Sequence, residues 1–166
     1  MAEPIFAFHA IGIIHTPFQR PAGTPIQAKA TLERGSIEIF PRYAEGLADL
    51  DGFSHIYLLY VLDQMASPAL KVTPFLDGKE HGVFATRAPR RPNPIGLSIV
   101  RLLKVEGAHL EFEGADMLDG TPLLDIKPYV PDFDHFQPTR IGWYEQRLAA
   151  PDARMVADDR FDKRQP

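Results

Sequence analysis

Prolines and glycines divide this chain into short segments, and that division most constrains what it can fold into. The 166 residues contain 16 prolines and 12 glycines, and the prolines run from Pro4 to Pro166. Both residue types interrupt helices, and the apolar stretches between them have the length of strands. The sequence therefore predicts a mainly β protein with short helices, built as a small barrel or a sandwich.

The clearest local prediction is a β-hairpin. Leu97–Glu106 is rich in β-branched and aliphatic residues, Gly107 and Ala108 supply a turn, and His109–Glu113 alternates between apolar and polar side chains. Leu110 and Phe112 should therefore point inward, with the glutamates outward.

Other segments have less distinct patterns. Residues 6–15 and 36–40 are expected as strands, and residues 41–50 as a short helix. Residues 54–62 are apolar on both faces of a pleat, which predicts a central strand covered on both sides. We expect one domain over residues 1–150. Residues 151–166 carry four acids and four bases with few apolar anchors, which predicts a loosely held tail.

Several classes of protein are excluded by what the chain lacks. It has no cysteine, which rules out disulfides, thiolate zinc sites and a cysteine nucleophile. It has no glycine fingerprint for a Rossmann dinucleotide site. No apolar run is long enough for a membrane span, and the N-terminus does not resemble a secretion signal, so we expect a cytoplasmic protein. Asp132, Asp134 and His135 fit a polar turn better than a metal site, and no metal is expected.

Charge is distributed unevenly along the chain. The net charge is −4, which argues against a general nucleic-acid binder. Residues 79–104, however, hold six basic residues and one acid, whereas residues 105–135 hold eight acids and one lysine. These segments are either two solvated faces of opposite sign or a basic platform beside an acidic one.

The connector Val83–Ser98 is the segment most indicative of function. Pro89, Pro92 and Pro94 stiffen it, and Arg87, Arg90 and Arg91 lie on it. A stiff loop loses less entropy on binding, and arginine pairs with carboxylates and phosphates. The alternative is a proline-rich connection with solubilising arginines.

A second candidate segment is the bend within Gly114–Tyr129. Its Asp119-Gly120-Thr121 turn exposes backbone groups that can recognise an adenine edge or a ribose. Asp116, Asp119 and Asp125 cluster around it. The alternative is a turn whose aspartates bond their own backbone.

Specific strings in both segments resemble those of a known family. The strings Arg91-Pro92-Asn93-Pro94-Ile95-Gly96-Leu97-Ser98 and Leu118-Asp119-Gly120-Thr121-Pro122 are similar to those of the TrmO-like family of S-adenosylmethionine-dependent tRNA methyltransferases. Further matching strings lie at Ala85–Arg87, Leu123–Tyr129, Ile11–Phe18, Gly35–Pro41 and Leu50–Tyr60. The resemblance covers about residues 6–135.

This resemblance implies a fold, an activity and a set of contacts. The fold would be a small closed β-barrel, unlike the Rossmann-type methyltransferases. The protein would be a homodimer that binds S-adenosylmethionine and methylates N6 of threonylcarbamoyladenosine beside a tRNA anticodon. Carried over by position, the cofactor contacts would be Pro25, Ile26, Gln27, Asp63, Gln64, Arg87, Leu97, Leu118, Asp119, Gly120 and Thr121.

The chemistry assigns further roles. Methyl transfer to a poor nitrogen nucleophile needs a group that takes its proton, and Asp116 and Asp125 are both candidates. Arg90 and Arg91 are expected to contact RNA phosphate or the carboxylate of the modified base, with Asn93 beside them. Two alternatives stay open: a barrel that binds S-adenosylmethionine or RNA without transferring a methyl group, and a methyltransferase acting on a small molecule.

Overall fold

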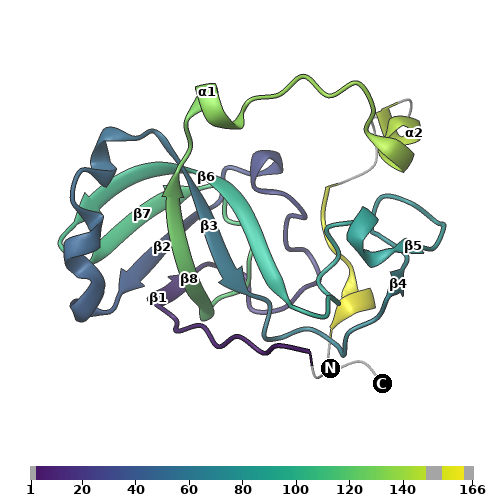
Figure 1. The fold of residues 1–166 in the computed structure, drawn as a ribbon, viewed down its shortest axis with the longest axis horizontal. Coiled ribbons are helices and arrows are strands. Elements are labelled where there is room, and N and C mark those ends of the chain that lie inside the picture. The colour runs from purple at the N-terminus through teal and green to yellow at the C-terminus, as the bar shows by residue number, and fades with distance from the viewer. Residues whose placement is uncertain (1–2, 149–154, 163–166) are drawn as a thin grey trace.

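The structure is a computed structural model, and it describes residues 3–148 and 155–162. Six antiparallel strands close a barrel in the order β1-β2-β7-β6-β3-β8 (Figure 1). They are β1 (Gly12–His15), β2 (Arg34–Ile39), β3 (His55–Val61), β6 (Ile95–Glu106), β7 (His109–Glu113) and β8 (Thr121–Pro128). The prediction of a mainly β, closed barrel is therefore confirmed.

Smaller elements surround the barrel. Two short strands, β4 (Lys71–Val72) and β5 (His81–Gly82), pair with each other to one side. The α-helices α1 (Pro131–Asp134) and α2 (Glu145–Leu148) are one turn each. The 3₁₀ turns are Ala28–Ala30, Pro41–Leu47, Leu50–Gly52, Val83–Ala85, Gly142–Tyr144 and Asp159–Phe161. No helix in residues 3–148 or 155–162 is long and apolar enough to cross a membrane.

The predicted hairpin is β6 and β7, and it supplies much of the core. Gly107 takes the positive φ of 61° that the turn requires. Leu110 and Phe112 are fully buried, as the alternation predicts. They pack with Ile14, Ile37 and Leu58 from the other walls of the barrel. Burying a side chain of this size contributes about 1.5–3 kcal/mol, so the barrel interior carries most of the stability.

Two strand predictions were wrong in part. The first strand begins at Gly12 and not at residue 6. Ile11 still hydrogen-bonds through its backbone to Phe40 and Leu123, but β2 ends at Ile39 and Pro41 starts a 3₁₀ turn, so residues 6–10 extend beyond this pairing. β3 is buried on its inner face only; its outer face is partly exposed because it forms the wall of a closed barrel. The predicted helix over residues 41–50 is replaced by 3₁₀ turns.

Part of the C-terminal segment differs from a loosely held tail. Phe161 is buried beside Val72 and Val83, and its ring lies 5.0 Å from that of Phe75. Val156 forms a β-bridge with Pro25. The buried ring of Phe161 and backbone bonds of Met155 and Ala157 to the first loop therefore hold residues 155–162 in place, although many of these residues are polar. Residues 149–154 and 163–166 lie outside the described residues, and the domain boundary at residue 150 stays a prediction.

Candidate active site

A cavity of about 840 Å³ opens beside the barrel, within the range typical of small-molecule sites. Segments far apart in the sequence meet around it. They are the first loop at residues 21–27, the end of β3 and its continuation at residues 60–65, the connector at 84–91, the start of β6 at 95–97, and the bend at 116–121. The connector and the bend, which the sequence singles out separately, thus face the same space.

Most of the residues proposed for cofactor binding line this cavity. The residues that do are Pro25, Ile26, Gln27, Asp63, Gln64, Arg87, Leu97, Leu118 and Thr121. Asp119 and Gly120 lie on the same bend but are not part of the lining. Arg87 donates a 2.9 Å hydrogen bond to Oε1 of Gln27, which joins the connector to the first loop. The cavity thus combines apolar walls with a few fixed polar groups, as a site for a nucleoside-like ligand requires.

The two general-base candidates are separated by the fold. Asp116 lines the cavity. Asp125 does not: it lies on β8, where its Oδ2 pairs with Nζ of Lys127 at 2.9 Å and its side chain is 46% exposed. Of these two, only Asp116 is therefore positioned to accept a proton from a ligand in the cavity.

Asp116 ends a short chain of hydroxyl groups. Ser98 donates to its Oδ1 at 2.6 Å, and Oη of Tyr60 lies 2.9 Å from Oγ of Ser98. Since Ser98 has one proton and gives it to Asp116, the Tyr60 hydroxyl donates to Ser98. Burial raises the pKa of Asp116 to about 6, against the opposing effects of the Ser98 bond, a backbone N–H of Ala28 and the charge of Arg87. Burial likewise raises the pKa of Tyr60, which keeps its proton.

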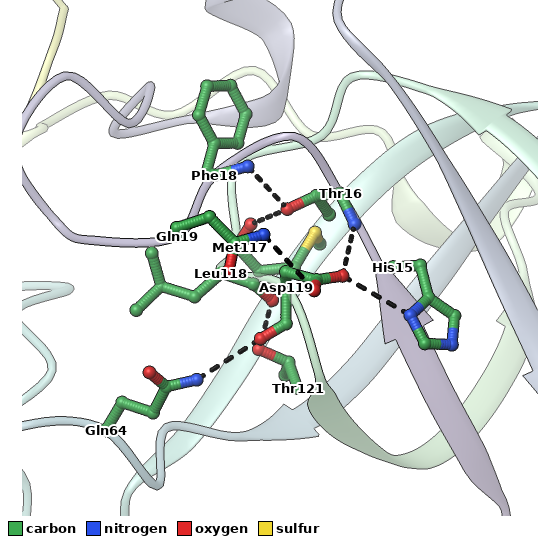
Figure 2. Close-up of polar contacts among 9 residues, drawn as sticks. All are labelled: His15, Thr16, Phe18, Gln19, Gln64, Met117, Leu118, Asp119 and Thr121. Carbon is green, nitrogen blue, oxygen red and sulfur yellow. Dashed lines mark hydrogen bonds and ion pairs between the residues drawn. The ribbon is translucent and has the colours of Figure 1, made fainter.

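Asp119 links the bend to the end of β1 and the residues that follow it, 15–19 (Figure 2). Its Oδ1 accepts from the backbone N–H of Thr16 at 3.1 Å and lies 3.3 Å from Nδ1 of His15, while Oδ2 accepts from Gln19 at 3.2 Å. Its carbonyl accepts from Nε2 of Gln64, a cavity residue, at 3.2 Å. The carboxylate of Asp119 is thus occupied by the protein, and its observed contacts fix the shape of the bend.

These contacts predict a pH-dependent contribution to stability. Burial opposes ionisation, but the hydrogen bonds from Gln19, Thr16 and His15 together lower the pKa of Asp119. A lowered pKa stabilises the fold above the unfolded-state value of about 3.9, and this stabilisation is lost as pH falls through the folded-state value.

We expect Asp119→Ala to lower the free energy of unfolding by about 1–3 kcal/mol at pH 7, through the loss of these hydrogen bonds. Urea titrations from pH 7 to pH 3 should show the difference from the unsubstituted protein shrinking below about pH 4. Asp51→Ala, which removes an exposed carboxylate on another turn, is the control and should change little. A deficit that stayed constant down to pH 3 would contradict the role of the charge.

The arginines of the connector are engaged by the protein itself. Nη1 of Arg91 lies 3.1 Å from the carbonyl oxygen of Val83 and 2.9 Å from that of Thr86, and it donates to both. Nε of Arg90 donates to the carbonyl of Ser67 at 2.7 Å. Arg91 lines the cavity, whereas Arg90 and Asn93 do not. Contact of these three residues with RNA stays a prediction, and the observed bonds give both arginines a role in shaping the connector.

One wall of the cavity was missed by the sequence reasoning. It comes from the C-terminal part of the chain, through Ile141, Trp143, Tyr144, Met155, Ala157 and Phe161. The available signal was Trp143, the single tryptophan of the chain, within a segment otherwise poor in apolar residues. Asp132, Asp134 and His135 are not part of this lining, and Asp134 accepts the backbone N–H of Val130 at 2.8 Å.

Comparison with known proteins identifies the family. Residues 13–135 match the family model of the tRNA-methyltransferase O N-terminal domain, TrmO_N. The chain belongs to the TrmO_N family. The matched range contains all six barrel strands except the first residue of β1, together with the connector and the bend.

Relatives of the TrmO_N chain include curated proteins and solved structures. It is 50% identical over 145 residues to a Pyrococcus abyssi protein named "Probable S-adenosyl-L-methionine-binding protein", covering 87% of this chain and 79% of the relative. It is 40% identical to the mouse tRNA (adenine(37)-N6)-methyltransferase, covering 75% of this chain and 31% of the mouse protein. The crystal structure of TrmO from Pseudomonas aeruginosa superposes with a TM-score of 0.72 at 39% identity, covering 87% of this chain and 63% of that one.

Proposed function

We propose that this protein transfers a methyl group from S-adenosylmethionine to N6 of threonylcarbamoyladenosine beside the anticodon of a tRNA. The observation that carries the proposal is the meeting of the connector and the bend around one cavity. Family membership supports the reaction class, and the names of the relatives support the cofactor and the nucleic acid. The pairing of Arg87 with Gln27, and the contact of Gln64 with the bend, give the cavity fixed polar groups for the cofactor.

S-adenosylmethionine, when bound, supplies the methyl group on a sulfonium sulfur. A carboxylate beside that sulfur would stabilise the ground state more than the transition state, in which the positive charge disappears. The occupied carboxylate of Asp119 therefore serves the shape of the site and not the rate. Alignment of the two reactants by the walls of the cavity supplies most of the acceleration, up to about 7–11 kcal/mol.

Asp116 takes the proton of the acceptor nitrogen. S-adenosylmethionine bound in the cavity would supply the methyl group and keep the electron pair of its sulfur–carbon bond, while Asp116 would accept the N6 proton that the acceptor nitrogen loses. With a pKa of about 6, Asp116 is ionised at neutral pH and ready to accept. The Tyr60 and Ser98 hydroxyls orient its carboxylate.

The proposal includes a homodimer. Ile95, Leu97 and Ile99 point outward from β6 and are 41%, 48% and 42% exposed. Ile95 and Leu97 also line the cavity, so a second copy covering this apolar stripe would close the site. Sedimentation equilibrium of the full chain tests this part: a dimer supports it, and a monomer at micromolar concentration rejects it.

The reaction is tested with methyl-labelled S-adenosylmethionine and three acceptors. We expect label to enter a tRNA that carries threonylcarbamoyladenosine, and not the same tRNA transcribed without the modification. The free modified nucleoside is the third acceptor. Mass spectrometry of the digested tRNA should place the new methyl group on the modified adenosine. Label in the nucleoside but not in tRNA would favour a small-molecule methyltransferase, and cofactor binding without any transfer would leave only a binding protein.

A further inference from the structure

One wall of the cavity lies beyond the family match and contains the tryptophan Trp143. The chain leaves β8, passes α1 and runs across the molecule to α2 (Figure 1). Before α2, Ile141, Trp143 and Tyr144 line the cavity. We call residues 141–144 the strap. The family match ends at residue 135, so the strap lies outside the matched range.

Trp143 is fixed by contacts with the connector and with β5. Its indole Nε1 donates to the carbonyl of Ala85, on the connector, at 2.8 Å. Its ring stacks on that of His81 with centroids 4.9 Å apart and planes 22° apart. His81 is held in turn by Oδ2 of Asp77, 2.8 Å from its Nε2. The indole therefore has a defined orientation, although the residues before it, 137–140, are exposed.

These contacts determine what Trp143 can offer to a ligand. The only polar atom of the indole is already bonded to Ala85, so what remains for the cavity is aromatic surface. One face is occupied by His81, and the ring of Tyr144 stands at 72° to the indole. An aromatic surface of this kind binds a flat heteroaromatic ring by stacking.

We propose that Trp143 is a ligand-binding residue that stacks against an adenine ring bound in the cavity. The strap is then one wall of the binding site. This inference rests on the proposed function, in which two ligands contain adenine: the methyl donor and the acceptor nucleotide. Both offer the same chemistry, and titrations with the two ligands separately distinguish them.

The test uses the fluorescence of the full chain. Trp143 is the only tryptophan among the 166 residues, so tryptophan emission reports on the strap alone. The probes are S-adenosylhomocysteine, for the donor, and an anticodon stem-loop RNA carrying threonylcarbamoyladenosine, for the acceptor. We expect one of them to quench the emission, with a midpoint equal to its dissociation constant from calorimetry.

Variants separate stacking from a merely structural role. Trp143→Ala should weaken binding of the quenching probe by about 5- to 150-fold, the range for loss of one stacked base. Trp143→Phe, which keeps an aromatic ring, should restore most of that affinity. Phe136→Ala, which removes a 79% exposed ring just before the strap and outside the cavity, is the matched control and should bind normally.

The outcomes are distinct. Binding of both probes by calorimetry without quenching, or with equal affinity in Trp143→Ala, overturns the stacking proposal and leaves the proposed function standing. Equal weakening in Trp143→Phe and Trp143→Ala also overturns it, because an aromatic ring would then be irrelevant. Failure of both probes to bind the unsubstituted protein rejects the proposed function and this inference with it.

Discussion

Replacing Asp116 by asparagine should lower kcat for methyl transfer by about 10²- to 10⁴-fold, the range for loss of a general base. The amide cannot take the N6 proton, but its oxygen can still accept the hydrogen bond from Ser98. Calorimetry should therefore find cofactor affinity nearly unchanged. Because the pKa of Asp116 is raised by burial, its ionised form costs stability at neutral pH, and the variant should unfold no more easily than the unsubstituted protein.

The pH dependence provides a second, independent readout of the same role. A base must be deprotonated to act, so kcat/KM, which reports the free protein, should rise with pH through about 6 and level off above it. This rise with pH, the acidic limb of the profile, should be absent from the residual activity of Asp116→Asn. Asp125→Asn is the matched control, because Asp125 lies on the barrel wall with Lys127 and away from the cavity. Equal losses in the two variants, or a pH limb that survives in Asp116→Asn, would exclude Asp116 as the base.

The sequence predicted those parts of the fold that depend on local pattern. Alternation of apolar residues is a direct consequence of the pleat, so Leu110 and Phe112 could be assigned to the interior. The end of a strand depends instead on where its neighbour ends. Residues 6–10 are as apolar as β1, yet they form no strand, because they lie beyond the backbone bonds of Ile11 to Phe40 and Leu123, where β2 gives way to the 3₁₀ turn at Pro41. Closure of the barrel likewise came from the family resemblance and not from the pattern.

The site was predictable where its chemistry was concentrated in one segment. The connector and the bend each carry their polar residues within a short stretch, and both line the cavity. The role of Asp119 in fixing the bend was harder to predict, because its partners His15, Thr16 and Gln19 are about 100 residues away in the sequence. For the strap the sequence offered only the single tryptophan as a signal, because the contacts of Trp143 with Ala85 and His81 are not encoded in any periodicity.

Gly96→Ala should strongly destabilise the barrel. Gly96 and Tyr60 are direct partners across β6 and β3, and the tyrosine ring lies over the glycine. A Cβ on residue 96 would overlap atoms Cε2 and Cζ of that ring. Since Tyr60 is buried and its hydroxyl is bonded to Ser98, the ring cannot move aside without breaking the chain that ends at Asp116.

Overpacking of this kind costs about 3 kcal/mol, which for a chain of this size lowers Tm by about 6–12 °C. Calorimetric melting of the variant measures the shift, and its kcat should fall as well, because Ser98 would lose the Tyr60 donor that helps to orient Asp116. Gly46→Ala adds the same carbon where no other atom lies within 4 Å, and it should melt within about 2 °C of the unsubstituted protein. A Gly96→Ala protein with normal Tm but low activity would separate the Tyr60 contact from the stability of the barrel; normal values of both would mean that the ring does not rest on Gly96.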